Sequence, residues 1–472
     1  MIAKWHLIDG EPWREGTEPL RELVDPWTGD AIATIPMAGE ATVARAVASA
    51  RAALPRLRML TIGDRIARLD VLLELVRARS EELAATLVVE MGKPIRSARR
   101  EIDSVLTAAT WFRDHAIELL APVDSGEPGL SIVREPVGVV AAITPFNFPL
   151  QLLSWKLFPA FLSGCPVVCK PDPRTAISTT ILAEWASEAS WPKGAFTVIH
   201  GAAETGARLV AHDDVAKVAF TGSISAGRAV YTRAAAGLKR VTLELGGCSP
   251  LVVCSDARID DAIAAVCARA FGNSGQFCYR ISRAYVHRSR HDELVDKCTV
   301  AARKLVVGDP RDAATELGPL VDREAVAIVH ERIAEAERCG ATVVLDGRLH
   351  TRTHPGLVGP TVLDDVPDDA AIMAHETFGP TLAIAPFDEL DDAIARANDT
   401  PYGLGAFALT EDPATAQRLA RELEAGTVWC GAIDRASMAA PFGGRKDSGI
   451  GIEKSRWAFD AYALPRALYF KV

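Results

Sequence analysis

Short apolar runs alternate with stretches of helical periodicity through most of the chain, and this alternation constrains the fold more than any other feature. The first such runs are four to seven residues long and cover residues 137–143, 166–169, 196–199, 217–220 and 241–245. Strands buried on both faces read as continuous apolar runs, and parallel strands need crossover connections of about a dozen residues or more. The pattern predicts a mostly parallel sheet with helices on both faces.

A second alternating series follows Gly247. It contains the runs PLVVC, ISRAYVH, TLAIA, GAFAL and TVWC, separated by helical stretches such as 259–270 and 289–306. The first third of the chain has apolar spacings of three and four residues, which predict helices over 41–58, 64–91 and 94–120. The simplest fold is therefore α/β, with two doubly wound units that join near Gly247.

Composition narrows the range of partners. The 472 residues include 52 Lys and Arg against 61 Asp and Glu, so the net charge is −9. This acidic balance argues against nucleic acid or an anionic membrane as the main partner. The first 15 residues hold no long apolar stretch, and the longest uncharged run, 136–155, contains three prolines. We therefore expect no targeting segment, no membrane span and a cytoplasmic location.

The cysteines and histidines do not form an evident metal-binding pattern. Nine cysteines are scattered without a C-x-x-C pair, which favours reduced thiols over a disulfide framework or a zinc site. His287 and His291 lie four residues apart, the spacing of a metal pair on one helix face, but no third ligand is evident near them. The sequence predicts no metal site.

Two motifs carry a nucleophile and a base. Cys278 ends the glycine-rich segment GNSGQFC, where an irregular loop can bring its sulfur to a cleft. The thiol is either a nucleophile held partly as thiolate or an ordinary packed cysteine. Glu244 interrupts the apolar strand VTLELGG. Because a buried carboxylate is costly, it is either satisfied by a structural partner or raised in pKa and poised as a base.

Two further motifs present an amide and a helix start. In TPFNFP, two prolines fix the backbone around Asn147, whose side chain is either an oxyanion donor or a turn cap. The segment FTGSISAG at 220–227 follows a strand and opens a helix, a junction that can hold phosphate, although its spacing matches neither common glycine-rich nucleotide motif. A thiol, a carboxylate, an amide and a nucleotide-type turn together are the set needed for covalent oxidation of a carbonyl.

From about residue 20 to residue 460, several stretches resemble motifs of the aldehyde dehydrogenase superfamily. They follow one another in the same order and at similar spacing as in that superfamily. They are PFNFP, KP at 170–171, FTGS, LELGG, GQ-x-C, ETFGP at 376–380 and PFGGRKDSGIG at 441–451. The resemblance implies oxidation of an aldehyde to a carboxylic acid with NAD or NADP, through a cysteine thiohemiacetal and thioester. It implies Cys278 as nucleophile, Glu244 as general base, and Asn147 with the Cys278 backbone N–H as oxyanion donors.

The resemblance also implies a cofactor site and a domain arrangement. The cofactor residues are Lys170 at the adenosine ribose, Gly222 and Ser223 at the pyrophosphate, and Glu376 and Phe378 at the nicotinamide. The expected division is a Rossmann-like dinucleotide-binding domain (1–120 and 136–247), a catalytic domain (248–440) and bridging strands (121–135 and 455–472). The bridging strands predict a homodimer or homotetramer, and the only other expected partner is a small-molecule aldehyde.

Three positions depart from the family pattern. Cys248 replaces a common lysine after LELGG, with no assignable consequence. Pro173 stands where NAD-preferring relatives often carry a glutamate, and the Arg174 that follows is a candidate partner for a ribose 2′-phosphate, so NAD and NADP both remain open. Leu464 stands where many members have a glutamate that relays protons to the base, which predicts that this relay is absent or rebuilt.

The sequence does not identify the aldehyde. Trp155, Phe277 and Tyr279 match regions that line the substrate funnel of relatives, and an aromatic entrance suits aliphatic or aryl aldehydes. Arg435 either binds the carboxylate of a semialdehyde or is a surface charge. Three alternatives stay open: a CoA-acylating dehydrogenase, which does not need Glu244, a catalytically silent relative that serves as a binding or structural protein, and a thiol hydrolase.

Overall fold

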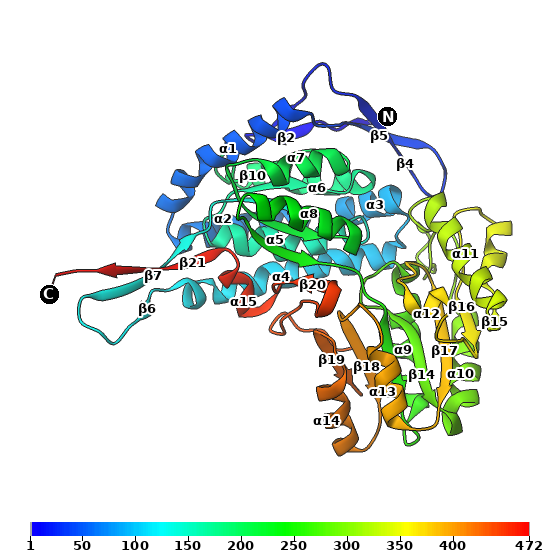
Figure 1. The fold of residues 1–472 in the computed structure, drawn as a ribbon. Coiled ribbons are helices and arrows are strands. Elements are labelled where there is room, and N and C mark those ends of the chain that lie inside the picture. Colours follow the sequence, from blue (N-terminus) through cyan, green and yellow to red (C-terminus); the bar gives the residue numbers. More distant parts are fainter. Residues whose placement is uncertain (1, 472) are drawn as a thin grey trace.

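Five parallel strands form the centre of an eight-stranded sheet in the computed structural model, which describes residues 2–471 (Figure 1). Across the sheet these are β12 (Arg240–Glu244), β11 (Val215–Thr221), β8 (Val139–Ile143), β9 (Val167–Lys170) and β10 (Phe196–Val198). Antiparallel strands complete the edges, with β20 (Gly449–Ile450) beside β12, and β2 (His6–Ile8) and β3 (Glu11–Trp13) beyond β10. The predicted strands are present, with ends that differ by one or two residues.

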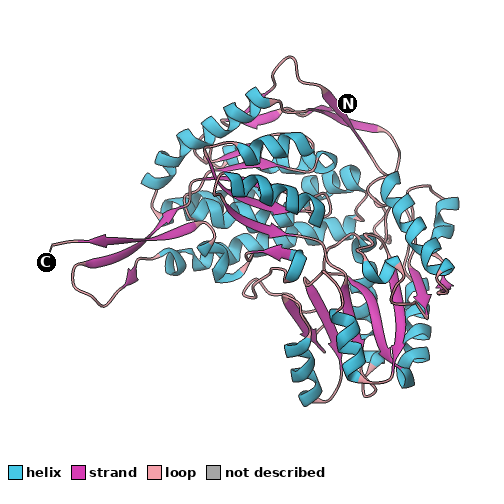
Figure 2. Ribbon diagram, viewed as in Figure 1, coloured by secondary structure: helices cyan, strands magenta, loops and turns pink. Residues whose placement is uncertain are grey.

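Helices cover both faces of this sheet (Figure 2). They are α1 (Glu40–Met59), α2 (Ile62–Ala78), α3 (Ser80–Met91), α4 (Ile95–Leu120), α5 (Pro149–Leu162), α6 (Ala176–Glu188), α7 (Ala203–Ala211) and α8 (Ile224–Ala236). Val140 and Ala142 of β8 pack in a core with α4, α5 and α6, whereas Val139 and Ala141 pack in another with α7 and α8. Successive residues of a strand point to opposite faces, so a fully apolar β8 follows from burial on both sides.

The helix predicted over 64–91 is two helices. Its periodicity continues through the break, but α2 ends before Arg79, whose φ of −119° and ψ of 25° are not helical. Glu81 and Glu82 in the first turn of α3 favour the new start, because negative charge is stabilised at a helix N-terminus.

A seven-stranded sheet forms the second α/β unit. Six strands are parallel, and the order is β15 (Thr342–Leu345), β16 (Thr361–Asp364), β17 (Thr381–Phe387), β14 (Ile281–His287), β13 (Ser249–Val253), β18 (Gly405–Leu409) and β19 (Thr427–Cys430), with β15 antiparallel at one edge. Its helices are α9 (Ile259–Phe271), α10 (His291–Arg303), α11 (Arg323–Arg338), α12 (Ala371–Ala374), α13 (Leu390–Asn398) and α14 (Pro413–Glu422). Two apolar cores lie on its two faces. The predicted class, two doubly wound α/β units, is confirmed.

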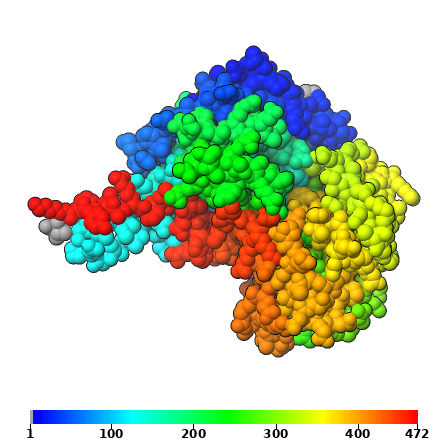
Figure 3. Space-filling model, viewed as in Figure 1, coloured from blue at the N-terminus to red at the C-terminus, as the bar shows by residue number. Residues whose placement is uncertain are grey.

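Two small sheets lie outside these units. β1 (Ile2–Ala3), β5 (Ala31–Pro36) and β4 (Leu20–Val24) form one near the N-terminus. β6 (Val123–Asp124), β7 (Leu130–Pro136) and β21 (Ala463–Tyr469) form the other, and we call it the arm because it projects from the body of the molecule (Figure 3). Strands β7 and β21 pair in register over seven residues.

The start of the expected bridging strand 455–472 is helical instead. Residues Ser455–Asp460 form α15, and Phe459 is fully buried with its ring edge-on to Phe112 of α4 at 5.6 Å. The reason is the apolar pair that Ala458 and Phe459 supply to the first core, which a projecting strand would expose. Within the described residues, no helix has both the length and the apolar character needed to cross a membrane.

A buried ion pair fixes the loop that carries Asn147. The Lys93 ammonium pairs with the Glu101 carboxylate and donates to the Asn147 carbonyl at 2.8 Å. The other Glu101 oxygen accepts from the backbone N–H groups of Leu150 and Gln151, at 3.0 and 3.1 Å, in the first turn of α5. A carboxylate from α4 therefore satisfies the exposed donors of α5 and holds the segment before it.

Lys93→Met should lower stability substantially, because Glu101 would stay buried without its cation. Breaking one partner of a buried pair typically costs about 3–5 kcal/mol. The measurement is the unfolding midpoint in urea. The double variant Lys93→Met/Glu101→Gln removes both charges but keeps an acceptor for α5, so it should recover part of the loss. Equal midpoints for the single and the double variant would contradict this role of the pair.

Candidate active site

The loop before Cys278 has an unusual backbone. Asn273, Ser274 and Gly275 all have positive φ, at 51°, 54° and 71°. A side chain at Gly275 would overlap the carbonyl of Gly379, so this loop lies directly against the segment that follows Glu376. Residues held in sparsely populated backbone regions persist only where surrounding structure imposes them, and here they bring the thiol to the junction of the two units.

Cys278 lies at a cavity of about 370 Å³ between the two α/β units. Its lining includes the other residues of the predicted set, namely Asn147, Gly222, Ser223, Glu376 and Phe378, with Pro145, Phe146, Leu152 and Thr221 among others. Residues separated by more than 200 positions thus meet at one surface. Five of the predicted catalytic and cofactor residues share this cavity with the thiol.

Glu244 ends β12 directly before Leu245 and Gly246, which line the cavity, and is not itself among the lining residues. Its side chain is almost fully buried, and within residues 2–471 neither carboxylate oxygen has a hydrogen-bond partner. Burial raises the pKa of Glu244 well above its ordinary value, the charge of Glu453 raises it further, and Lys156 opposes both. A carboxylate with free lone pairs and a raised pKa can accept a proton at neutral pH.

Lys156 and Glu453 are functional neighbours that the sequence reasoning missed. The Lys156 ammonium lies 2.6 Å from a Glu453 oxygen and donates to the Thr221 hydroxyl at 2.7 Å, and both charged groups are buried. Lys156 is the one charged residue in the apolar helix α5, which was the available signal. Leu464 pairs with Glu135 in the arm. The expected loss of a glutamate near the base is therefore offset by Glu453, which approaches from a different segment.

The surroundings of the Cys278 thiol disfavour its ionised form. Burial raises its pKa, and the nearby carboxylates of Glu376 and Glu244 raise it further, while the backbone N–H groups of Cys278 and Tyr279 lower it. Ionisation of the thiol needs a proton acceptor, and Glu244 is a nearby buried carboxylate whose two oxygens have no hydrogen-bond partner within residues 2–471.

The Asn147 side chain reaches the thiol loop. Its amide nitrogen donates to the Gln276 carbonyl at 3.0 Å, and Asn273 donates to the Asn147 carbonyl at 3.2 Å. An amide NH₂ has two hydrogens, so one remains for a second acceptor in the cavity. The turn-cap alternative does not describe this side chain, because its partner lies 129 residues away.

A second cavity of about 600 Å³ continues from the first over the N-terminus of α8. Both cavities are lined by Phe146, Thr221, Gly222 and Ser223, so they form one groove. Backbone N–H groups at a helix start favour phosphate, and the Ser223 hydroxyl caps α8 by accepting from Ala226 at 3.3 Å. A groove of this length with a phosphate-binding turn at its centre fits a dinucleotide.

Lys170 and Arg174 both line the groove, but their charged groups have different hydrogen-bond partners. The buried Lys170 ammonium donates to the carbonyls of Pro171 and Gly201, both at 3.0 Å. The Arg174 guanidinium is held by the carboxylates of Asp172, at 2.9 Å, and Asp322, at 2.7 Å. Arg174 is thus already paired with two anions, which argues against the idea that it pairs with a ribose 2′-phosphate.

Glu376 and Phe378 are held at the junction of the two cavity walls. Glu376 accepts from the Gly247 N–H at 3.1 Å, and burial raises its pKa to about 7. The buried Arg280 fixes this loop by donating to the Thr377 carbonyl at 2.6 and 3.0 Å, a contact that the sequence did not reveal. Cys248 packs behind the loop with its sulfur 3.6 Å from the Met373 carbonyl, so a small thiol occupies that space.

A separate cavity of about 180 Å³ lies near Cys278. Its lining includes the predicted Trp155, Tyr279 and Arg435, together with Trp429, Phe442 and Lys454. Phe277 is buried edge-on against Tyr279 at 5.4 Å and is not part of this lining in the described chain. Trp155 and Phe442 pack in one apolar cluster with Cys278, so the cavity adjoins the thiol.

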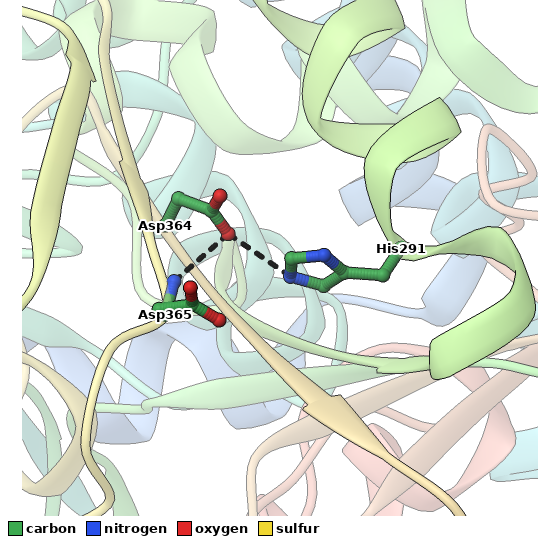
Figure 4. A group of neighbouring side chains, drawn as sticks. All are labelled: His291, Asp364 and Asp365. Carbon is green, nitrogen blue, oxygen red and sulfur yellow. Dashed lines mark hydrogen bonds and ion pairs between the residues drawn. The ribbon is translucent and has the colours of Figure 1, made fainter.

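One histidine of the sequence pair contacts carboxylates. His291 at the start of α10 lies 2.9 Å from Asp364 at the end of β16, with Asp365 beside them (Figure 4). Asp364 also accepts from the Asp365 backbone N–H at 2.8 Å. His287 instead contacts Ser289. The His291–Asp364 contact ties α10 to β16 and lies outside the cavities described above.

Comparison with known proteins gives one consistent family. The sequence model described as "Aldehyde dehydrogenase family" matches residues 13–467. A glutarate-semialdehyde dehydrogenase of Pseudomonas aeruginosa is 37% identical, covering 93% of this chain and 91% of that protein, and the NADP(+) succinate-semialdehyde dehydrogenase GabD of Escherichia coli is 36% identical, covering 97% and 95%.

A solved structure supports the same assignment. The indole-3-acetaldehyde dehydrogenase of P. syringae, in complex with NAD+, superposes with a TM-score of 0.96 at 35% identity and covers 100% of this chain and 97% of that one. The chain therefore belongs to the aldehyde dehydrogenase family, whose members oxidise aldehydes with NAD or NADP.

Proposed function

We propose that this protein oxidises its aldehyde through a covalent bond to Cys278, with Asn147 and Glu244 as the assisting groups. The observation that carries the proposal is the cavity in which the thiol and the Asn147 amide meet, with the unpaired carboxylate of Glu244 beside them. The same cavity continues into the groove at α8, so a bound dinucleotide and an aldehyde can reach the same sulfur.

The first step forms a carbon–sulfur bond. The Cys278 thiol gives its proton to Glu244 as the sulfur attacks the carbonyl carbon, and the carbonyl oxygen becomes an oxyanion. The free hydrogen on the Asn147 amide and the Cys278 backbone N–H are the donors for this oxyanion. One such donor typically contributes about two to three orders of magnitude in rate, so Asn147→Ala should lower the rate of oxidation by a factor in that range.

The second step needs the cofactor, and the groove fits it. When bound, the nicotinamide supplies the acceptor for the hydride that leaves the carbon as the oxyanion collapses. Lys170, Gly222 and Ser223 line the groove, and Glu376 and Phe378 lie at the end near the thiol. The product on Cys278 is a thioester. Glu244 returns the proton of the thiol to solvent and then takes a proton from water, which attacks the thioester carbon. The carbon–sulfur bond breaks, Glu244 gives this proton to the departing Cys278 sulfur, and the carboxylic acid is released.

Neither the CoA-acylating nor the silent alternative is favoured. The relatives that the chain matches are named as aldehyde-oxidising dehydrogenases, and a buried carboxylate stands beside the thiol where water would be activated. A thiol hydrolase would use neither the groove at α8 nor Glu376. Product analysis with and without CoA separates the two acyl acceptors.

Cys278→Ala should abolish turnover, and Glu244→Gln should slow both the first release of reduced nicotinamide and the steady rate. Without the thiol no covalent adduct forms. Without Glu244 neither the thiol nor the attacking water has its base, and general-base catalysis contributes about 10²–10⁴ in rate. The measurement is rapid-mixing absorbance of reduced nicotinamide. Steady turnover by the Cys278 variant would exclude the covalent route.

The pH dependence of kcat should respond in opposite directions to two substitutions near Glu244. Glu244 must be ionised, so activity falls as the pH drops through its pKa. Glu453→Gln removes a charge that raises the pKa of Glu244, and the acid limb should move to lower pH. Lys156→Met removes a charge that lowers this pKa, and the limb should move to higher pH. Shifts of the same sign would contradict the assignment of Glu244 as the titrating base.

We also propose that the arm joins copies of this chain into a homodimer or homotetramer. β21 lies at the edge of its three-stranded sheet, and an edge strand offers unpaired backbone groups to another chain. Tyr469 and Phe470 at its end are 76% and 61% exposed, which is unusual for large apolar side chains in a monomer.

The pair Tyr469→Glu/Phe470→Glu should reduce the molar mass measured by light scattering after size-exclusion chromatography, because charges would have to be buried in the contact. Met59→Glu, at an apolar residue that is 85% exposed outside the arm, is the matched control and should leave the mass unchanged. An unchanged mass for the arm variant would argue against this contact.

A further inference from the structure

The largely buried side chain of Lys454 presents its ammonium to the small cavity near the thiol. The side chain lines the cavity of about 180 Å³, and its residue is only 9% exposed. Lys454 and Ser455 both have positive φ, at 61° and 51°, a conformation that non-glycine residues rarely adopt. Two such residues in succession at a cavity wall indicate that the turn is held there by its surroundings.

This ammonium contacts aromatic rings but has no anionic or hydrogen-bonding partner in the described part of the chain. No carboxylate lies within ion-pair distance of it, and its side chain makes no hydrogen bond within residues 2–471. The other buried lysines near the catalytic loop are satisfied: Lys93 by Glu101 and Lys156 by Glu453. Burial lowers the pKa of Lys454 to about 8, with no nearby anion to restore it. An ammonium on a cavity wall with no carboxylate beside it is a binding group for an anionic ligand.

The rest of the cavity is also positively charged. Arg269 and Arg435 line it with Lys454, and no aspartate or glutamate is among the lining residues. Arg269 is held in place by donating to the Ile433 carbonyl at 2.9 Å, with its guanidinium 5.3 Å from the Tyr279 ring centroid. Three cations without a carboxylate are notable in a chain with a net charge of −9. Such a wall attracts anions.

The aromatic walls do not offer a free site for a cation. Faces of tryptophan and phenylalanine attract quaternary ammonium groups when they are open. Here the Lys454 ammonium lies 5.4 Å from the Trp155 ring centroid and 5.9 Å from that of Phe442, so the chain supplies its own cation to these rings. A substrate with a second positive charge would be repelled at this position.

We propose that this cavity holds the far end of the substrate, that Lys454 binds a carboxylate there, and that the protein oxidises aldehydes that carry a second, anionic end. The inference rests on the proposed role of Cys278, since the cavity adjoins that thiol through the cluster of Trp155 and Phe442. Arg269 and Arg435 attract the anion at the wall, while Lys454 is the buried group that contacts it. The matched relatives named for glutarate and succinate semialdehydes are named for aldehydes of this class.

The test compares three aldehydes of equal chain length that end in a carboxylate, its methyl ester or a trimethylammonium group. Wild-type protein should have the highest kcat/KM for the carboxylate and the lowest for the trimethylammonium compound. Lys454→Met should lower kcat/KM for the carboxylate by about 10- to 100-fold, mainly through KM, because a hydrogen bond to a buried charge is lost. Its activity on the ester should stay within about twofold of wild type, which also shows that the variant is folded.

Lys304→Met is the matched control, since Lys304 is exposed at the end of α10 and lies outside the cavity. It should retain the wild-type preference. Equal losses on ester and carboxylate in Lys454→Met, or a wild-type preference for the ester, would overturn the inference. If no aldehyde were oxidised in a Cys278-dependent way, the proposed function itself would fail, and the ester measurements make that result distinct.

Discussion

The chemistry of the site depends on a carboxylate that is buried without a hydrogen bond. Glu244 ends a strand of the first sheet, and neither of its oxygens accepts a hydrogen bond from any residue in the range 2–471. Beside it, the Lys156–Glu453 pair contributes one positive and one negative charge, so an ionised Glu244 leaves a net negative charge in an apolar region. Holding a proton relieves this cost, which is the physical reason that the pKa of Glu244 is raised. The fold thus makes Glu244 a stronger base by burying its carboxylate without a hydrogen-bond donor in the described chain.

Convergence of distant loops is achieved by close backbone contacts. Gly275 allows the thiol loop to lie against Gly379, and Gly449 lets β20 approach the Leu243 carbonyl at the end of β12. Buried charges then fix the side chains: Lys93 with Glu101 holds the Asn147 segment, and Arg280 holds the loop of Glu376. Small residues set the distance between the loops, and ionic hydrogen bonds set their orientation.

Sequence periodicity was sufficient to predict the two sheets, because a strand that is apolar on both faces has few stable placements other than a buried parallel sheet. The four motifs also identified Cys278, Glu244 and Asn147, since each is an exception to its local pattern. What the sequence did not reveal depends on long-range pairs. Glu453 is 297 residues from Lys156, and no local signal links them. The pairing of Arg174 with Asp322, which is 148 residues away, is likewise decided by a tertiary neighbour.

The turn at Glu453 and Lys454 connects the two halves of the site. Successive residues on a helix point about 100° apart, so Trp155 and Lys156 of α5 face different surroundings. Glu453 pairs with Lys156 on the side of the base, and Lys454 lies over Trp155 on the side of the small cavity. The positive φ of Lys454 permits this divergence within two residues. The same strained turn therefore sets the charge around Glu244 and the charge in the small cavity. The strain is explained by the opposite directions of the two side chains, since the Glu453 carboxylate points toward Lys156 and the Lys454 ammonium toward the small cavity.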